Sequence, residues 1–310
     1  MKAFVLGELC EDILMHSPAS VEVMGQKIWA KDILLTAGGS TYYTGAALRA
    51  LGADVEVCSA VGDDASGQRV IRTLRSMEVG CTHIRTLPGE KTTRSIIVCN
   101  GCEKDFIGCS PMLPLPLPQW DQLKNADLFY IAGYTLYPEL WTEEMRSLCR
   151  MANDHHICVA MDSQMLPISG NNLAEVSGLR HILPTVNIFF TARKEALRLF
   201  GTDDETCCHE IMREMGFTGQ LILKSGSKGC RVMDHVSVYF VPAVSVNAYD
   251  TVGSGDVFGA SYCWGWCQGW DMVKSARFAA AYTALSIEEY DEKKRFPSAA
   301  EAEDLLLQNL

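Results

Sequence analysis

The sequence lacks three features that define whole classes of protein. It has no excess of basic residues, since 27 Lys and Arg stand against 38 Asp and Glu and give a formal net charge of -11. Nucleic-acid binding needs clustered positive charge, so we expect no nucleic-acid partner. No run reaches about 18 uncharged apolar residues, so we expect no membrane-spanning helix and no membrane partner. Glu8 and Glu11 interrupt the first apolar stretch, which argues against a secretion signal and favours a cytoplasmic protein.

The 13 cysteines do not form a metal-binding pattern. Cys99 and Cys102 make one CxxC pair with Cys109 nearby, but there is no second CxxC pair. A structural zinc site usually needs four ligands, so zinc is not expected here. Without a secretion signal, reduced thiols packed in strands and helices are the better interpretation.

Three catalytic sequence motifs are also absent. The phosphate-binding pattern GxxxxGK[ST] and the hydrolase pattern GxSxG do not occur. Gly253 and Gly255 begin a GxG pattern, but Gly259 falls one residue too late to complete GxGxxG. These absences argue against a P-loop enzyme, a serine hydrolase and a typical dinucleotide-dependent dehydrogenase.

What the chain does contain is a regular alternation of short apolar runs with amphipathic segments. This alternation predicts an α/β fold with a doubly wound, mostly parallel sheet flanked by helices. With 310 residues, of which 48% are hydrophobic, the chain is long enough for one large core. The predicted strands are residues 3–6, 55–60, 128–132, 157–161, 188–191 and 221–223, and the main predicted helices are residues 40–51, 66–77, 141–152, 173–183, 193–200, 210–215 and 257–267.

Two segments break the alternation, at about residues 15–36 and 90–112. In the first, apolar and polar residues alternate around Gly25 and Gln26, and in the second a turn at Asn100 and Gly101 separates two strand-like runs. Both patterns are typical of antiparallel hairpins. We therefore expect a single domain over residues 1–310 that carries a small β-sheet lid formed by these two segments.

Residues 250–256, with the sequence DTVGSGD, lie immediately before an uncharged apolar run. Gly253 and Gly255 allow a tight turn, and a turn that opens a helix directs free N–H groups and the positive end of the helix dipole at one point. Such a point binds phosphate or developing negative charge. Asp256 would be an awkward neighbour for an anion unless it accepts a proton, so we interpret it as a general base.

Three further ligand-binding patterns follow predicted strands. They are the acidic segment at residues 8–12, the pair Gly38 and Gly39 before a helix, and the loop at residues 224–229 with Lys224 and Lys228. The carboxyl ends of strands in open α/β sheets are where ligands bind. Tyr42 and Tyr43 just inside the glycine-pair helix are compatible with core packing and with stacking on a substrate.

These motifs resemble those of the ribokinase-like (PfkB) family of carbohydrate kinases. DTVGSGD resembles the family signature DTxGAGD, with Ser in place of Ala. Residues 38–52 resemble a second signature, a Gly-Gly pair and a helix ending in Leu-Gly. Residues 61–67 match VGDDxxG, and residues 224–229 resemble the nucleotide loop TxGxxG with Lys in place of Thr.

The resemblance implies an enzyme that uses ATP and Mg²⁺ to transfer the γ-phosphoryl group to a hydroxyl of a sugar or sugar-like molecule. Asp256 would be the general base, and the N–H groups of Gly253, Ser254 and Gly255 would form an anion hole. The implied substrate-binding residues are Asp12, Gly38, Gly39 and Tyr43. The implied nucleotide-binding residues are Lys224, Gly226, Ser227 and Gly229. Glu195 would position Mg²⁺ through water, a monovalent cation would bind near the signature, and two copies would form a homodimer through the lid.

The sequence departs from the family at positions outside the phosphoryl-transfer motif. Tyr43, Ala192 and Ala280 stand where the family usually has Asn, and residues 290–295 replace a Gly-Ala segment. The substrate and the preferred phosphoryl donor are therefore left open. A nucleoside kinase of the same fold is one alternative, and a non-catalytic sensor that binds a sugar or nucleotide is an alternative of another class.

Overall fold

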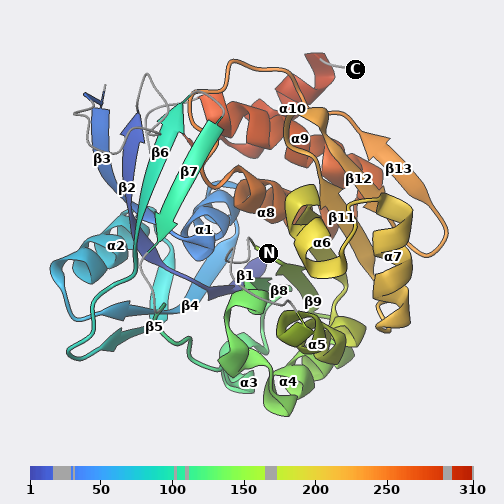
Figure 1. Cartoon of the computed structure of the whole chain (residues 1–310), viewed down its shortest axis with the longest axis horizontal. Coiled ribbons are helices and arrows are strands. Elements are labelled where there is room, and N and C mark those ends of the chain that lie inside the picture. The colour runs from blue at the N-terminus through green and yellow to red at the C-terminus, as the bar shows by residue number, and fades with distance from the viewer. Residues whose placement is uncertain are drawn as a thin grey trace.

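The computed structural model describes residues 1–16, 29–30, 32–100, 103–108, 112–164, 173–288 and 295–308. A nine-stranded sheet forms the centre of the protein, in the order β13-β12-β11-β10-β9-β8-β1-β4-β5 (Figure 1). The strands from β5 to β11 are parallel, and β12 and β13 are antiparallel at one edge. The bounds are β1 (Lys2–Gly7), β4 (Asp54–Gly62), β5 (Gly80–Leu87), β8 (Leu128–Ala132), β9 (Cys158–Asp162), β10 (Ile188–Ala192), β11 (Gln220–Lys224), β12 (Cys230–Met233) and β13 (Val238–Val241).

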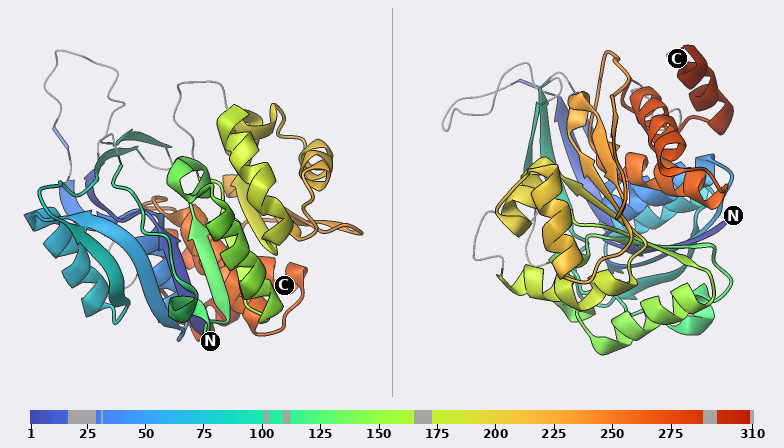
Figure 2. Two further views of the ribbon diagram at one scale, coloured as in Figure 1. Left: turned by 90° about the horizontal axis from the view of Figure 1, so that it is seen from below. Right: turned by 90° about the vertical axis from the view of Figure 1, so that its right-hand side faces the viewer.

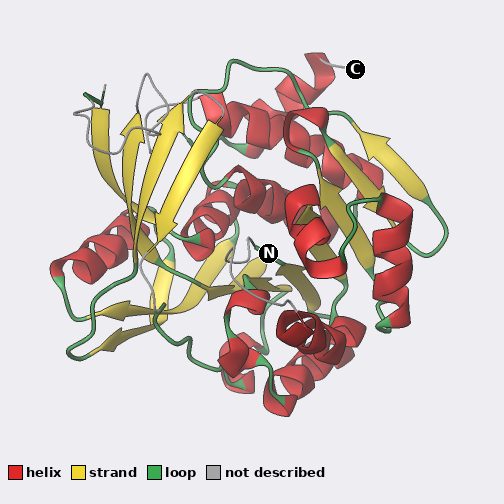
Figure 3. Ribbon diagram, in the orientation of Figure 1, coloured by secondary structure: helices red, strands yellow, loops and turns green. Residues whose placement is uncertain are grey.

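Helices cover both faces of this sheet because successive side chains of its central strands are apolar on both sides. In β1, Ala3 and Val5 pack into one core and Phe4 and Leu6 into the other. In Figure 2 the green-to-yellow helices and the orange-to-red helices lie on opposite faces of the sheet, and Figure 3 shows all helices in red and the strands in yellow. The first core is covered by α1 (Ser40–Ala50), α2 (Ala65–Ser76), α8 (Ser254–Cys267), α9 (Met272–Glu288) and α10 (Ala299–Gln308). The second is covered by α3 (Trp120–Leu123), α4 (Glu143–Asp154), α5 (Leu173–Ile182), α6 (Arg193–Phe200) and α7 (Glu205–Glu214).

A smaller, four-stranded sheet stands beside the central one, in the order β3-β2-β6-β7 (Figure 1). Only Glu8 and Leu9 separate the end of β1 from the start of β2, so the chain passes directly from one sheet into the other. The bounds are β2 (Cys10–His16), β3 (Asp32–Gly38), β6 (Arg94–Asn100) and β7 (Glu103–Gly108). Four single turns of 3-10 helix complete the described structure, namely η1 (Tyr134–Leu136), η2 (Pro138–Leu140), η3 (Leu183–Thr185) and η4 (Gly226–Lys228).

The strand register brings the carboxyl ends of neighbouring parallel strands to one edge. Gly7 pairs with Ala132, Ala132 with Asp162, and Ala192 with Lys224. Each of these residues is at the end of its strand, so polar side chains there share one edge of the central sheet. This is the edge at which open α/β sheets bind ligands.

The fold class expected from the sequence is confirmed, and three local details differ. Cys10–Asp12, expected in a loop, belongs to strand β2, because it pairs with β3. Strand β5 was not predicted. Helix α2 begins at Ala65, one residue before the predicted start, and its N-cap is Asp64, whose side chain accepts from the Gly67 N–H. The turn expected at Gly25 lies outside the described residues. Within the described ranges, no helix is long and apolar enough to cross a membrane.

Candidate active site

The DTVGSGD segment forms a tight turn that starts helix α8. Gly253 is the N-cap, with φ 72°, and a Cβ at this position would overlap the Tyr43 ring. Both the left-handed backbone and the close approach of the ring require glycine. Among the described residues, no carbonyl or side chain accepts from the backbone N–H groups of Gly253, Gly255 or Asp256. These free donors and the positive end of the helix dipole are the features that the predicted anion site requires.

The Ser254 N–H is engaged differently from its glycine neighbours. It donates to the Thr251 carbonyl over 3.2 Å, which is a long hydrogen bond. The expected anion hole thus has free donors at Gly253 and Gly255, a further free donor at Asp256, and an occupied donor at Ser254. A phosphoryl oxygen would have to compete with the Thr251 carbonyl for that fourth N–H.

Asp256 lies in the first turn of α8 with 8% of its surface exposed. Its Oδ1 accepts from Gln164 Nε2 at 2.6 Å. Burial raises the pKa of Asp256 to about 7, and repulsion from Asp162 adds to the increase, while Lys224 and the Gln164 hydrogen bond oppose it. A carboxyl group with a pKa near neutrality suits general-base catalysis at physiological pH.

Lys224 places a positive charge beside the start of α8. Its Nζ lies 2.5 Å from Asp162 Oδ2, and a Cβ on Gly255 would lie 3.2 Å from the same Nζ. Nearby carboxylates outweigh burial, so the pKa of Lys224 is raised and the ammonium stays charged. The lysine therefore places a fixed charge beside Gly255, where a phosphate bound at the helix start would lie.

Glu195 belongs to the same group of charges. Its Oε2 accepts from the Ala192 N–H at 2.6 Å and from Ser163 Oγ at 2.9 Å, so the carboxylate is held at the start of α6. Burial raises the pKa of Asp162, and repulsion from Glu195 makes a smaller contribution to the increase. Mg²⁺ is typically held by one or two carboxylates, waters and substrate phosphates. The carboxylates of Asp162 and Glu195 fit this kind of ligand set, and no group of three or more His, Cys, Asp or Glu suited to a metal ion is found in the described part of the chain.

The loop that follows Lys224 is shaped by two glycines. Gly226 has φ 57° and opens the 3-10 turn η4, which contains Ser227, and Gly229 has φ 92°. A Cβ on Gly229 would overlap the carbonyl of Val241, so this glycine is required by the approach of strand β13. At Gly226, by contrast, no described atom lies within 4 Å of the position that a Cβ would take, so this position is open.

The predicted substrate-binding residues gather around the Asp12 carboxylate. A Cβ on Gly38 would overlap that carboxylate, and a Cβ on Gly39, with φ 86°, would overlap the Glu8 carbonyl. Tyr43 links this group to the signature: its hydroxyl makes a long contact of 3.5 Å with Asp12 Oδ2, and its ring packs on Gly253. The structure thus brings together the four residues that the sequence assigned to substrate.

Two acidic groups in this region carry perturbed pKa values. Burial raises the pKa of Asp12 to about 6, despite hydrogen bonds from Cys10 and Tyr43 that favour its charged form. Burial also raises the pKa of Glu8 to about 7, and the nearby Asp12 charge adds to this increase. A ligand that donates hydroxyl hydrogen bonds to Asp12 would favour its charged form.

The VGDDxxG segment has a structural role at the junction of the two sheets. Asp64 caps α2 and also accepts from Thr92 Oγ1 at 2.7 Å, just before strand β6. The buried Glu11 of β2 accepts from Ser66 Oγ at 2.5 Å and from Arg69 Nε at 2.6 Å. These bonds fasten the small sheet to α2.

Four residues near the site were not assigned to it from the sequence. Asp162 is the last residue of strand β9 and Gln164 follows it, and the position of Asp162 at a strand's carboxyl end was a usable signal. Lys104 of β7 donates to the Thr251 carbonyl at 2.6 Å. Arg295 contacts Asp250 and Val252 from the segment before α10. No local sequence pattern indicates that Gln164, Lys104 or Arg295 lies near the site, because these residues contact the signature segment only through tertiary packing.

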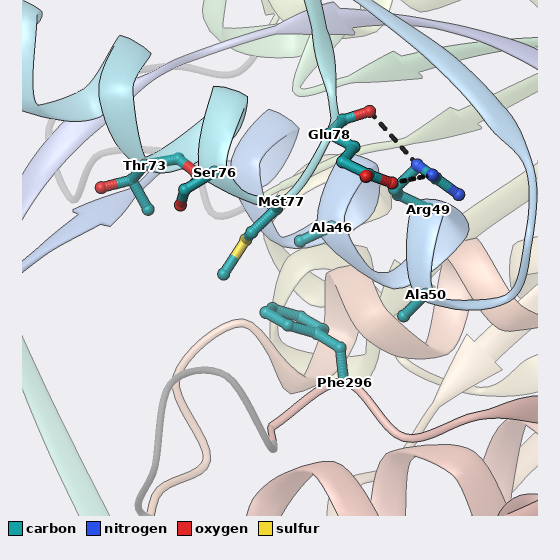
Figure 4. Close-up of a pocket in the computed structure, with 8 residues that line it drawn as sticks. All are labelled: Ala46, Arg49, Ala50, Thr73, Ser76, Met77, Glu78 and Phe296. Carbon is teal, nitrogen blue, oxygen red and sulfur yellow. Dashed lines mark hydrogen bonds and ion pairs between the residues drawn. The ribbon is translucent and has the colours of Figure 1, made fainter.

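A cavity of about 480 Å³ lies away from these residues, between α1 and α2 (Figure 4). Arg49 crosses to Glu78 on one side, and Phe296 closes another. None of the eight residues that line it belongs to the signature or to the group around Asp12. We therefore build the site from the strand ends and α8 rather than from this cavity.

The fold and the site define an α/β kinase of the ribokinase-like class. The sequence model described as pfkB family carbohydrate kinase matches residues 2–298. The chain therefore belongs to the pfkB family of carbohydrate kinases.

Individual relatives match most of the chain at low identity. A ribokinase of Lactococcus lactis is 21% identical over 305 residues, which span 97% of this chain and 95% of the relative. A 2-dehydro-3-deoxygluconokinase of Thermoproteus tenax is 24% identical over 273 residues, which span 82% and 80% of the two chains. These relatives act on different substrates by name, so family membership alone does not identify the acceptor.

Solved structures confirm the fold. Arabidopsis thaliana ribokinase, complexed with ribose and ATP, superimposes with a TM-score of 0.77 and 19% identity, over 98% of both chains. An E. coli structure in complex with ATP and Mg²⁺ also gives a TM-score of 0.77 and 19% identity, over 99% of both chains. At this identity the likeness establishes the ribokinase-like fold of this chain and leaves its ligands to be proposed.

Proposed function

We propose that this protein transfers the γ-phosphoryl group of ATP to a hydroxyl of a sugar or sugar-like small molecule. The observation that carries the proposal is the placement of Asp256. Its buried carboxyl, with a pKa of about 7, lies in the same helical turn as the free N–H groups of Gly253 and Gly255. A proton acceptor and an anion site at one helix start are the two groups that phosphoryl transfer to a hydroxyl requires.

The residues have distinct roles in this proposal. Asp12 orients the acceptor by accepting hydrogen bonds from its hydroxyls, and Asp256 takes the proton from the attacking hydroxyl. The free N–H groups at the start of α8 and the Lys224 ammonium stabilise negative charge on the transferred group. Asp162 and Glu195 would hold Mg²⁺, which neutralises charge on the phosphates when it is bound. The loop of Gly226, Ser227 and Gly229 would receive the nucleotide, and the small sheet would act as a lid that excludes water.

The decisive variant is Asp256→Asn, tested in two assays. ADP release would first be screened over sugars and nucleosides with ATP and Mg²⁺ to find an acceptor. With that acceptor, the variant should lose about 10³-fold or more in kcat, while ATP binding measured by calorimetry remains. Near-normal turnover by Asp256→Asn would contradict the proposed mechanism. Thermal stabilisation by a sugar, without phosphorylation of any compound by the wild-type protein, would favour the sensor alternative.

The structure offers little support for the nucleoside alternative. That alternative relied on Tyr42 or Tyr43 stacking on a base, but both side chains are buried, with 1% and 3% exposed. The Tyr43 ring already packs on Gly253 and lies 5.1 Å from the Arg295 guanidinium. Neither ring is available to a base in this conformation, so core packing is the better interpretation of the pair.

We also propose that two copies associate through the outer face of the small sheet. Leu35, Ile13, Ile96 and Ile107 form one row across its four strands, and Leu35 and Ile107 are 62% and 60% exposed. An exposed apolar row on a sheet is typical of an association surface. Light scattering should give a dimer mass for the wild type and a monomer mass for Ile107→Asp. Leu307→Asp, at an exposed position of α10, is the control and should leave the mass unchanged.

A further inference from the structure

Arg295 places a buried positive charge on the signature segment itself. The side chain is 8% exposed, and its Nη1 lies 2.8 Å from Asp250 Oδ2. Its Nη2 donates to the carbonyl oxygen of Val252, and its Cζ lies 5.1 Å from the centre of the Tyr43 ring. The guanidinium therefore bridges a carboxylate and a backbone carbonyl of the signature segment and lies near an aromatic ring of α1.

The contacted carbonyl belongs to the peptide unit that carries the first N–H group of the proposed anion hole. The Val252 carbonyl and the Gly253 N–H are part of the same planar peptide group, so fixing one fixes the direction of the other. Lys104 holds the preceding unit in the same way, by donating to the Thr251 carbonyl at 2.6 Å. Two cations thus orient two successive peptide units, and the second of these units carries the free Gly253 N–H.

This arrangement does not fit the monovalent cation that family resemblance led us to expect near the signature. A hard metal ion is bound by carboxylate and carbonyl oxygens. Here the Asp250 carboxylate and the Val252 carbonyl are already bound to the Arg295 guanidinium, and the Thr251 carbonyl is bound to Lys104. A metal ion at these oxygens would also lie against two fixed positive charges that repel it.

We propose that Arg295 supplies, as a fixed side chain, the positive charge that an exchangeable monovalent cation would otherwise supply to the signature loop. Arg295 is then a positioning residue: it orients the Val252–Gly253 peptide and does not touch the reacting groups. Arginine suits this role because it stays charged at every accessible pH and its planar fork binds two oxygens at once. The phosphoryl transfer should therefore not depend on K⁺ or Na⁺.

The first test needs no substrate, so it remains decisive if the proposed kinase function fails. Thermal unfolding is measured in KCl and in choline chloride at equal ionic strength. The wild-type melting temperatures should agree within about 1 °C, whereas Arg295→Met should melt about 3 °C or more higher in KCl, because K⁺ then binds the vacated oxygens. Arg150→Met, in an exposed helical ion pair, is the control and should show no preference for K⁺. A preference for K⁺ in the wild type overturns the proposal.

The second test rests on the proposed function and uses the acceptor found in the ADP-release screen. Wild-type kcat should change less than about twofold between choline chloride and about 100 mM KCl, while Arg295→Met should lose about tenfold or more in choline and recover in KCl. A folded Arg295→Met that K⁺ neither stabilises nor reactivates contradicts the proposal. If this variant does not fold, the wild-type comparison still decides, and Arg295→Lys, which keeps the charge, should remain independent of K⁺.

Discussion

At the residue scale, the ionisation of Asp256 determines when the proposed base can act. The pKa of Asp256 is raised to about 7, so the carboxylate needed for proton abstraction forms only as the pH rises through this value. We expect kcat/KM to increase about tenfold per pH unit below pH 7 and to level off above it. A steady-state pH profile with the identified acceptor measures this dependence.

Gln164 provides a matched variant for the same profile. Its Nε2 donates to Asp256 and favours the charged form of the carboxyl group, so Gln164→Met should raise the pKa further. The rising limb of the profile should then move to higher pH, with a similar plateau. An unchanged limb in this variant would mean that another group controls the profile.

The substitution Gly253→Ala tests whether the turn before α8 requires glycine. Gly253→Ala would place a Cβ into the Tyr43 ring and would add left-handed strain of about 1–2 kcal/mol. We expect a larger loss of stability than this strain alone and at least about a tenfold loss of kcat/KM. Gly52→Ala is the control, because Gly52 has φ 84° with no described atom within 4 Å of its Cβ position. Equal losses of stability in urea unfolding would show that the approach of the ring is unimportant.

At the scale of elements, the contact between the small sheet and α2 depends on Glu11. Its buried carboxylate accepts from Ser66 and Arg69, although Arg69 is 45% exposed and therefore partly screened. Glu11→Gln should lower the free energy of unfolding by about 1–3 kcal/mol, because a charge-assisted network loses its charge. Glu78→Gln is the matched control: Glu78 is 76% exposed in its pair with Arg49, and its loss should cost less than about 1 kcal/mol. Urea denaturation of both variants measures the difference.

At the scale of the whole molecule, the site reduces the stability of the fold at high pH. The pKa values of Asp256 and Glu8 are raised to about 7 and that of Asp12 to about 6, each above its ordinary value. Since the folded state then binds more protons than the unfolded state, these groups lower stability as the pH rises from about 4 to about 7. The buried carboxylates of the proposed site thus lower the free energy of unfolding when they are charged.

Asp256→Asn tests this opposition directly. At pH 8 the variant should be more stable than the wild type by on the order of 2 kcal/mol, because it removes a buried carboxylate charge. The difference should shrink as the pH falls toward 4, where the wild-type carboxyl is protonated in the folded state. Urea unfolding at several pH values provides the measurement, and a variant that is less stable at pH 8 would contradict the predicted sign.

The sequence by itself determined the class of fold, the family and the core of the site that we propose. Alternating apolar runs, and glycines at positions 253 and 255 before an apolar helix, are local patterns whose physical meaning does not depend on distant residues. Asp256 was identified for the same reason, as a carboxylate in the first turn of that helix. The order of the nine strands and the passage of β1 into β2 had no such local signal.

Only the tertiary structure decided how the site is held and charged. The contacts of Gln164 with Asp256, Lys104 with Thr251 and Arg295 with Val252 join positions 92, 147 and 43 residues apart in the sequence. Burial, which sets the pKa of Asp256, likewise comes from packing several elements together. Short sequence motifs therefore indicate the class of reaction. The charged and polar side chains that surround these motifs come from distant parts of the chain, so only the tertiary structure shows them.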